Sequence, residues 1–187
     1  MNPRAFWKPL DDFELPALKW VERVRFGGAI ERATEVVTLA GEHGLIWYCV
    51  AGAAAAGDKP RRAEWMRAGA AVATVYGANT ALKFVLRRRR PPVARIGTET
   101  DLSFPSSHAV TSFAAAAIFS ELAPAAKPAL YFGALGMTGS RLHFCVHYPS
   151  DLLAGALIGQ LAGRAAAKRY FAPVTASQEI GALARCR

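Results

Sequence analysis

Two histidines and an aspartate follow one another at intervals of four residues in the segment SRLHFCVHYPSD, residues 140–151. On a continuous helix this spacing would place His143, His147 and Asp151 on one face, where they could bind a metal ion. Pro149 argues against such a helix, because proline lacks the amide hydrogen and clashes with the preceding turn. Proline is favoured as the first residue of a helix, so we expect a new helix to begin at Pro149.

A helix break at this point favours chemistry by a single histidine. His147 would lie just before the new helix, with Asp151 in its first turn. The carboxylate could then bond to one imidazole nitrogen and leave the other for nucleophilic attack or base catalysis. Arg141, one to two turns earlier, could bind an anion through two parallel hydrogen bonds.

A second segment, SFPSSHAV at residues 103–110, has the features of a helix N-terminus. With Pro105 as the first helical residue, the amides of Ser106, Ser107 and His108 would lack partners within the helix. Free amides beside a hydroxyl form a cradle for an anion. His108 would then lie at the edge of that cradle, within reach of a bound group.

The densest positive charge is in KFVLRRRRPPVAR, residues 83–95, and the next acidic residue is Glu99. Such a run is commonly a solvated loop at lipid headgroups. Lys83 does not fit that explanation, because it lies a turn inside the preceding apolar helix pattern. A lysine in that position is costly unless it meets an anion, so the segment predicts an anion site.

Taken together, the three segments resemble the signature of the type 2 phosphatidic acid phosphatase superfamily, KX6RP, PSGH and SRX5HX3D. The matching residues are Lys83, Arg90 and Pro91; Pro105, Ser106 and His108; and Ser140, Arg141, His147 and Asp151. Ser107 departs from the pattern, which has glycine there. A serine should be tolerated in the first turn of a right-handed helix, but not where the family glycine needs a positive φ.

The resemblance implies a role for each matched residue. His147 would attack phosphorus, Asp151 would orient it, and His108 would protonate the leaving oxygen and later activate water. The phosphoryl oxygens would be held by Lys83, Arg90, Ser106, Ser107 and Arg141. The resemblance implies no metal and no cofactor, since fixed cations would supply the charge stabilisation that phosphoryl transfer needs. His143 has no family role.

Five apolar, alanine-rich stretches must position these residues. They are Gly44 to Gly57, Ala68 to Leu82, Ala109 to Ser120, Pro128 to Ser140 and Leu152 to Gly163. Each is shorter than the roughly 20 residues that span a bilayer. They are nevertheless apolar almost all round, and their small residues allow close helix packing, as in AGALIGQLAG. We therefore predict an all-α fold, a multi-pass transmembrane bundle of about five membrane helices of the phosphatase and haloperoxidase type.

The rest of the chain is predicted to form one domain with that bundle, residues 1–187. Residues 1–40 should contain amphipathic helices, with Ala17, Leu18, Val21 and Val24 on one face that suits a membrane surface. A helix packed on a protein core is the alternative. Residues 170–187 form a basic tail. The net charge of +9 favours anionic partners, which could be membrane lipids, phosphorylated substrates or nucleic acid.

These features together predict a multi-pass protein of the cell membrane that hydrolyses a lipid-linked phosphate and does not bind nucleic acid. Charge does not decide which membrane face carries the site. The segment DLSFPSSHA and the compact architecture resemble actinobacterial decaprenylphosphoryl-5-phosphoribose phosphatases. Undecaprenyl pyrophosphate, phosphatidylglycerophosphate and phosphatidate remain open as substrates. A non-catalytic membrane protein that binds anionic lipids is the alternative from another class.

Overall fold

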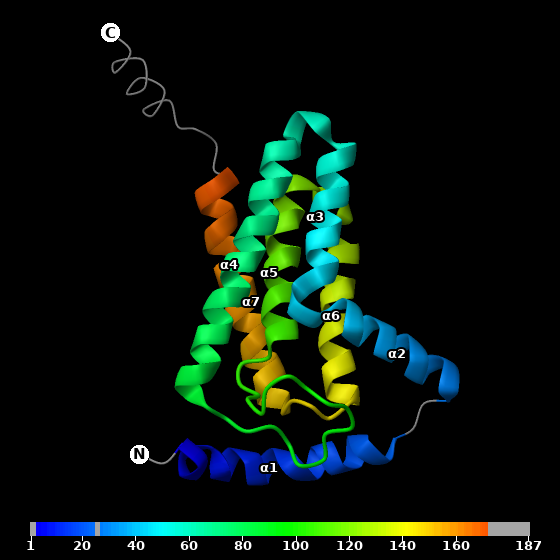
Figure 1. Ribbon diagram of the computed structural model, residues 1–187, viewed down its shortest axis with the longest axis vertical. Coiled ribbons are helices and arrows are strands. Elements are labelled where there is room, and N and C mark those ends of the chain that lie inside the picture. Colours follow the sequence, from blue (N-terminus) through cyan, green and yellow to red (C-terminus); the bar gives the residue numbers. More distant parts are fainter. Residues whose placement is uncertain (1–2, 25–26, 172–187) are drawn as a thin grey trace.

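The helices of the chain form a bundle that stands on a single crosswise helix (Figure 1). The computed structural model describes residues 3–24 and 27–171, so the predicted basic tail lies outside the described residues from residue 172 onward. The seven α-helices of this part are α1 (Pro3–Arg23), α2 (Gly28–Ala40), α3 (Leu45–Gly57), α4 (Arg62–Leu86), α5 (Ser107–Leu122), α6 (Lys127–His143) and α7 (Pro149–Phe171). One isolated bridge joins Arg89 to Leu102, and the described residues form no strand. The predicted all-α class is confirmed.

Four of the five predicted apolar stretches lie within the helices α4 to α7, and the first, Gly44 to Gly57, begins one residue before α3. The break between α6 and α7 is also as predicted, because α6 ends at His143 and α7 begins at Pro149. The predicted start of α5 is wrong. Ser106 keeps an extended backbone and its amide donates to the carbonyl of Asp151 at 3.2 Å, so the helix begins at Ser107 and Pro105 stays outside it.

Helix α5 lies at the centre of the bundle, and α7 packs directly on its backbone. Three glycines of α7, at intervals of four residues, make this approach possible. A Cβ added to Gly159 would lie 2.2 Å from the carbonyl oxygen of Val110, and one added to Gly163 would lie 2.7 Å from that of Ala114. At Gly155 the nearest atoms are the Cβ of Ala109 and the carbonyl of Ser106, both at 2.9 Å. This contact brings the first turn of α5 beside the first turn of α7.

The α5–α7 contact gives a test of the fold. We expect Gly159→Ala to lower the free energy of unfolding by about 1–3 kcal/mol, because the methyl group has no room against the α5 backbone. Gly136→Ala, also inside a helix, is the matched control, since a Cβ there meets nothing within 4 Å. It should leave stability unchanged or raise it by up to about 1 kcal/mol. Thermal unfolding in detergent measures both, and equal effects would contradict this packing.

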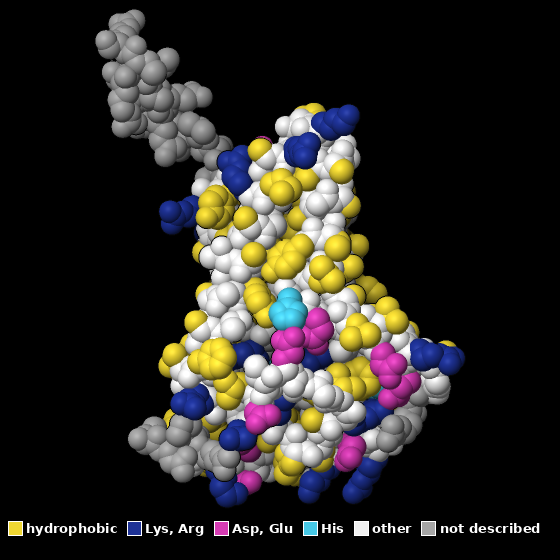
Figure 2. All heavy atoms as spheres, in the orientation of Figure 1, with side chains coloured by type: hydrophobic (Ala, Val, Ile, Leu, Met, Phe, Trp, Pro, Cys, Tyr) yellow, Lys and Arg dark blue, Asp and Glu magenta, His cyan; other side chains and the backbone are white. Residues whose placement is uncertain are grey.

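The surface of the bundle carries a belt of apolar side chains. Figure 2 shows yellow side chains over the helices, Lys and Arg at the upper end, and mixed charges at the lower end. Exposed large apolar residues on α3 to α7 are Leu45, Met66, Phe84, Val85, Phe132, Leu135, Leu153, Leu157, Leu161 and Tyr170. None of the described helices is by itself long and apolar enough to cross a bilayer, although α2 together with Glu42–Gly57 passes as a pair bent by 57°. The five membrane spans therefore stay a prediction.

Helix α1 lies across the lower end of the bundle (Figure 1) and presents two different faces. Leu18 is fully buried and packs with Cys145 and Tyr148, so the predicted apolar face rests on the protein there, although Ala17 is exposed. A second stripe, Phe6, Phe13 and Trp20 at intervals of seven residues, is 59–81% exposed. This aromatic stripe is free to contact a surface outside the protein.

Candidate active site

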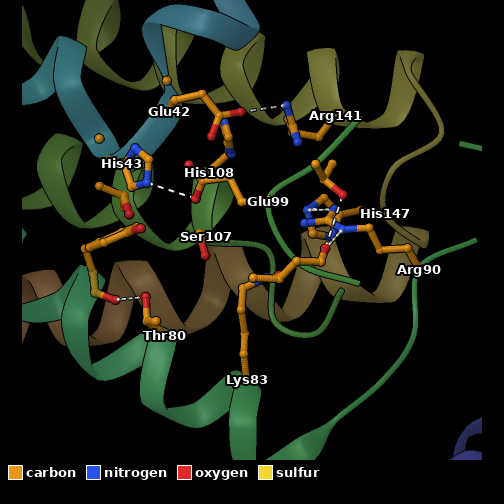
Figure 3. A pocket seen from close by; sticks show the side chains of 16 residues that line it. Glu42, His43, Thr80, Lys83, Arg90, Glu99, Ser107, His108, Arg141 and His147 are labelled. Carbon is orange, nitrogen blue, oxygen red and sulfur yellow. Dashed lines mark hydrogen bonds and ion pairs between the residues drawn. The ribbon is translucent and has the colours of Figure 1, made fainter. Parts of the chain in front are cut away.

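The three sequence segments meet at one pocket of about 110 Å³ near the junction of α2 and α3 (Figure 3). Six predicted site residues line it, namely Lys83, Arg90, Ser107, His108, Arg141 and His147. Ser106 and Asp151 are fully buried and do not line the pocket. The structure therefore places all eight predicted residues in or directly around one site.

Three cations, Lys83, Arg90 and Arg141, reach this pocket from different parts of the fold. Lys83 extends from the last turn of α4, where its Nζ donates to the carbonyls of Leu102 and Ser103 at 3.3 Å each. Arg141 extends from the last turn of α6 and is only 2% exposed. Its Nε and Nη1 have no hydrogen-bond partner among the described residues, apart from an ion pair of Nη1 with Glu42 at 3.6 Å. Buried donors without acceptors are costly, so this guanidinium is suited to bind an anion.

The hydrogen-bonding pattern sets the tautomer of His147. Its Nε2 lies 3.1 Å from Nη1 of Arg90. A guanidinium can only donate, so Nε2 accepts, and the hydrogen of the neutral ring is on Nδ1. That nitrogen lies 3.5 Å from Oδ2 of Asp151, which also accepts from the amide of Tyr148 at 2.9 Å. The lone pair of Nε2 is thus directed toward the cations of the pocket, with the carboxylate behind the ring.

His108 is held on the other side of the pocket by the α2–α3 junction. Its Nε2 lies 3.2 Å from the carbonyl of Thr38, which can only accept, and 3.8 Å from Oε1 of Glu42. The backbone of Gly41 lies so close that an added Cβ would be 2.6 Å from Cδ2 of His108 and 2.2 Å from Sδ of Met137. The junction therefore fixes the ring against a hydrogen-bond acceptor and beside a carboxylate.

Comparison with known proteins agrees with this geometry. Residues 64–173, more than half of the chain, match the family model described as the PAP2 superfamily. The chain belongs to the PAP2 superfamily. The family predicted from the three segments is confirmed.

Two mycobacterial proteins are among the relatives of the chain. It is 35% identical over 119 residues to the decaprenylphosphoryl-5-phosphoribose phosphatase of Mycolicibacterium smegmatis, covering 62% of this chain and 65% of that protein. The match therefore spans just under two thirds of that relative. It is 32% identical over 127 residues to the protein of the same name from Mycobacterium tuberculosis, covering 66% and 71%.

A solved structure shows the same fold. The crystal structure of the transmembrane PAP2 type phosphatidylglycerolphosphate phosphatase from Bacillus subtilis matches with a TM-score of 0.71 and 19% identity, covering 84% of each chain. The helical arrangement described above is therefore the PAP2 fold.

Ser107, the one departure from the PAP2 pattern, is accommodated. It is the first residue of α5, and its φ is negative, because the positive-φ non-glycine residues in the described part are His43, Arg87 and Cys145. Its Oγ accepts a hydrogen bond from Asn79 at 3.0 Å. The amides of Ser107 and the residue after it remain without intrahelical partners, whereas the amide of Ser106, predicted for the same cradle, is bonded to α7.

The structure gives His143 a place away from this pocket. It ends α6, and its Nε2 lies 3.3 Å from Glu31 of α2. His147 follows in the loop and Asp151 in α7, so the three side chains do not share a helix face. Within residues 3–24 and 27–171, no three His, Cys, Asp or Glu side chains are grouped to hold a metal ion. The metal interpretation of the segment is not supported.

The outer part of the pocket was not predicted from the sequence. Glu42 lies between His108 and Arg141, and His43 forms an exposed pair with Glu99 at 3.0 Å (Figure 3). His43 has a φ of 54° and the next residue, Gly44, a φ of 79°. This turn directs the α2–α3 junction toward the pocket. In the sequence, the glycine that follows the histidine is the one indication of such a turn.

The environment of His147 predicts how stability depends on pH. Burial is the main reason that the pKa of His147 lies well below its ordinary value of 6.5. Repulsion from Arg90, Lys83 and Arg141 acts in the same direction. The ring is therefore neutral at neutral pH.

In acid the unfolded chain protonates this histidine before the folded chain does, so the free energy of unfolding falls as pH drops below about 6.5, by up to about 1.4 kcal/mol per pH unit. His147→Gln removes this loss. Thermal midpoints measured between about pH 7.5 and pH 5 should therefore fall more steeply for the native protein than for the variant. Parallel slopes would show that His147 is not held neutral.

Proposed function

We propose that the protein is a phosphatase that hydrolyses a phosphate monoester on a polyprenyl-linked substrate, without a metal ion, through a phosphohistidine intermediate. The observation that carries the proposal is the position of His147, whose Nε2 lone pair faces the pocket lined by Lys83, Arg90 and Arg141. Such a constellation offers a nucleophile, fixed charge for the phosphoryl oxygens and a second histidine in one site.

In the first step, Nε2 of His147 attacks phosphorus. An N–P bond forms while the bond from phosphorus to the ester oxygen breaks, and the three cations hold the charge on the remaining phosphoryl oxygens. A protonated His108 gives its proton to the leaving oxygen, which becomes an alcohol. Burial and the charges of Arg141 and Arg90 disfavour a protonated ring, so this proton depends on the negative charge of the bound phosphate, together with Glu42 at 3.8 Å. Asp151 stabilises the positive charge that develops on His147.

The second step releases phosphate. His108, now neutral, takes a proton from a water molecule that attacks phosphorus. The N–P bond breaks, the electron pair returns to Nε2 of His147, and inorganic phosphate leaves. The hydrogen on Nδ1 stays beside Asp151 in both steps, so the ring returns to the starting tautomer. Apart from the attacking water, the cycle uses groups that the chain itself supplies.

Several surface features support a lipid-linked substrate and a multi-pass location in the cell membrane. The apolar belt of the bundle lies between two charged ends (Figure 2). On α7, Leu153, Leu157 and Leu161 form one exposed line. The aromatic stripe of α1 lies across the end of the bundle near the site, where it would meet the lipid headgroups. A substrate with its polyprenyl chain in the bilayer could then present its phosphate to the pocket.

The rim of the pocket favours a sugar phosphate over a diphosphate. Glu42 and Glu99 place carboxylates beside the phosphate site, and Thr80 and Thr98 add hydroxyl groups. Carboxylates repel a second phosphate bonded directly to the one that is cleaved, but accept hydrogen bonds from the hydroxyls of a sugar in that position. This arrangement favours decaprenylphosphoryl-5-phosphoribose over undecaprenyl pyrophosphate, and the names of the mycobacterial relatives point the same way.

Phosphate release from purified lipids tests the proposal. The full chain in detergent or vesicles is given decaprenylphosphoryl-5-phosphoribose, undecaprenyl pyrophosphate, phosphatidylglycerophosphate or phosphatidate, each with and without EDTA. We expect the ribose lipid to be hydrolysed fastest, with no effect of EDTA. In Glu99→Gln, the rate on the pyrophosphate should rise relative to that on the ribose lipid. Release from none of the four, or only with added metal, would overturn the proposed reaction.

A further inference from the structure

Arg88, one of four consecutive arginines and not part of the PAP2 signature, is fully buried beneath the site. Its guanidinium is bound on every side. Nε donates to Asp11 at 2.8 Å, Nη2 to Glu14 at 2.7 Å, and Nη1 to Asp151 at 2.7 Å. Nη1 also donates to the hydroxyl of Ser150 at 2.6 Å. The two outer acids come from α1, whereas Asp151 is the residue behind the nucleophile.

Two further contacts fix this guanidinium and join α1 to α7. The ring of Tyr148 lies 4.1 Å from the guanidinium carbon and that of Trp7 lies 5.0 Å from it. Glu14 also accepts from the backbone amide and the hydroxyl of Ser150, each at 2.7 Å, at the first turn of α7. A carboxylate near the N-terminus of a helix is favourably placed for its free amides and its dipole. Helix α1 therefore holds the segment that carries Asp151.

We propose that Arg88 is a positioning residue for Asp151, and that α1, through Asp11 and Glu14, is a working part of the active site. The inference rests on the function proposed above. Asp151 is bound from both sides: Oδ1 accepts from Arg88, and Oδ2 accepts from the Tyr148 amide and faces Nδ1 of His147. A continuous chain of short contacts thus leads from α1 to the nucleophile.

Because of charge balance, Arg88 and the two acids of α1 have different effects on His147. Asp11 and Glu14 share the charge of Arg88, which leaves more of the negative charge of Asp151 for the imidazole. Without the two outer acids, the full positive charge of Arg88 acts on Asp151 and on the ring beyond it. Without Arg88, the three carboxylates lose their shared counter-charge, and the carboxylate of Asp151 is protonated more easily.

The test compares kcat, KM and the pH dependence of kcat for phosphate release from the preferred lipid by the full chain. We expect Arg88→Gln and the double variant Asp11→Asn/Glu14→Gln each to lower kcat about tenfold or more, with KM changed by less than about twofold. The acidic limb of the profile should move to higher pH in Arg88→Gln and to lower pH in the double variant. Opposite shifts distinguish positioning and charge balance from a loss of folded protein.

Arg89→Gln is the matched control. It makes the same change one residue along the chain, but Arg89 is 55% exposed and pairs with the exposed Asp101. It should leave kcat, KM and the pH profile within about twofold. Wild-type kcat and an unshifted profile in the double variant, or shifts in the same direction in both variants, would overturn the inference. A native protein that releases no phosphate would instead overturn the proposed function.

Discussion

Replacing His147 by alanine should abolish phosphate release, with a loss of at least about 10³-fold in kcat. The variant lacks the nitrogen lone pair that accepts from Arg90 and faces the cations of the pocket. Lys83, Arg90 and Arg141 would still bind the phosphate, so substrate affinity should fall much less than turnover. Phosphate release and substrate binding, measured on the same preparation, separate the two effects.

His143→Ala is the matched control for this experiment. His143 lies four residues before His147, but its contact is with Glu31 of α2, away from the pocket. We expect its kcat to stay within about threefold of the native value, with some loss of stability from the broken pair. Full activity in His147→Ala, or a comparable loss in His143→Ala, would remove the basis for the assignment.

Asp151→Asn should have the second largest effect, a loss of about 10²–10⁴-fold in kcat. The carboxylate accepts from Arg88 on one oxygen and from the Tyr148 amide on the other. An asparagine must turn its NH₂ group toward one of these donors. If the NH₂ faces Tyr148 and His147, it favours an acceptor at Nδ1 and places the ring hydrogen on Nε2, so the nucleophilic lone pair is lost.

For Asp151→Asn, kcat and KM are measured separately, and ¹⁵N NMR shows which nitrogen of the His147 ring carries the proton. The hydrogen should lie on Nδ1 in the native protein and shift toward Nε2 in the variant. Asp101→Asn, at an exposed carboxylate paired with Arg89, is the control and should change neither quantity. A variant with native kcat would show that Asp151 does not orient the histidine.

The sequence was most informative where spacing and proline restrict the backbone. Pro149 correctly predicted the break between α6 and α7, which separates His143 from the site. The glycine-rich segment of α7 correctly predicted close helix packing, and that contact places the first turns of α5 and α7 together. The family pattern located Lys83 and Arg141 because each lies a fixed number of residues before another signature residue, Arg90 and His147 respectively.

Residues contributed by the N-terminal helices could not be found in this way. Thr38, near the end of α2, and Glu42, in the turn after it, reach His108 from a segment whose local sequence says little about this contact. The four consecutive arginines look alike in the sequence, yet Arg88 is fully buried and Arg89 is exposed. The partners that α1 and the start of α7 supply to Arg88 distinguish the two. The start of α5 was misplaced because a tertiary contact, from the Ser106 amide to α7, overrides the local preference of proline.

The central claim is that the phosphoryl group passes through His147. It is tested most directly by quenching the reaction under alkaline conditions, which preserve phosphohistidine, and mapping the modified residue by mass spectrometry. With a substrate whose leaving group needs no protonation, such as p-nitrophenyl phosphate, His108→Ala should slow only the attack by water and so increase the trapped fraction. We predict a phosphoryl group on His147 that forms and decays fast enough to account for turnover. Phosphate release at the native rate with His147 unmodified throughout, or with the phosphoryl group on another residue, would contradict the account.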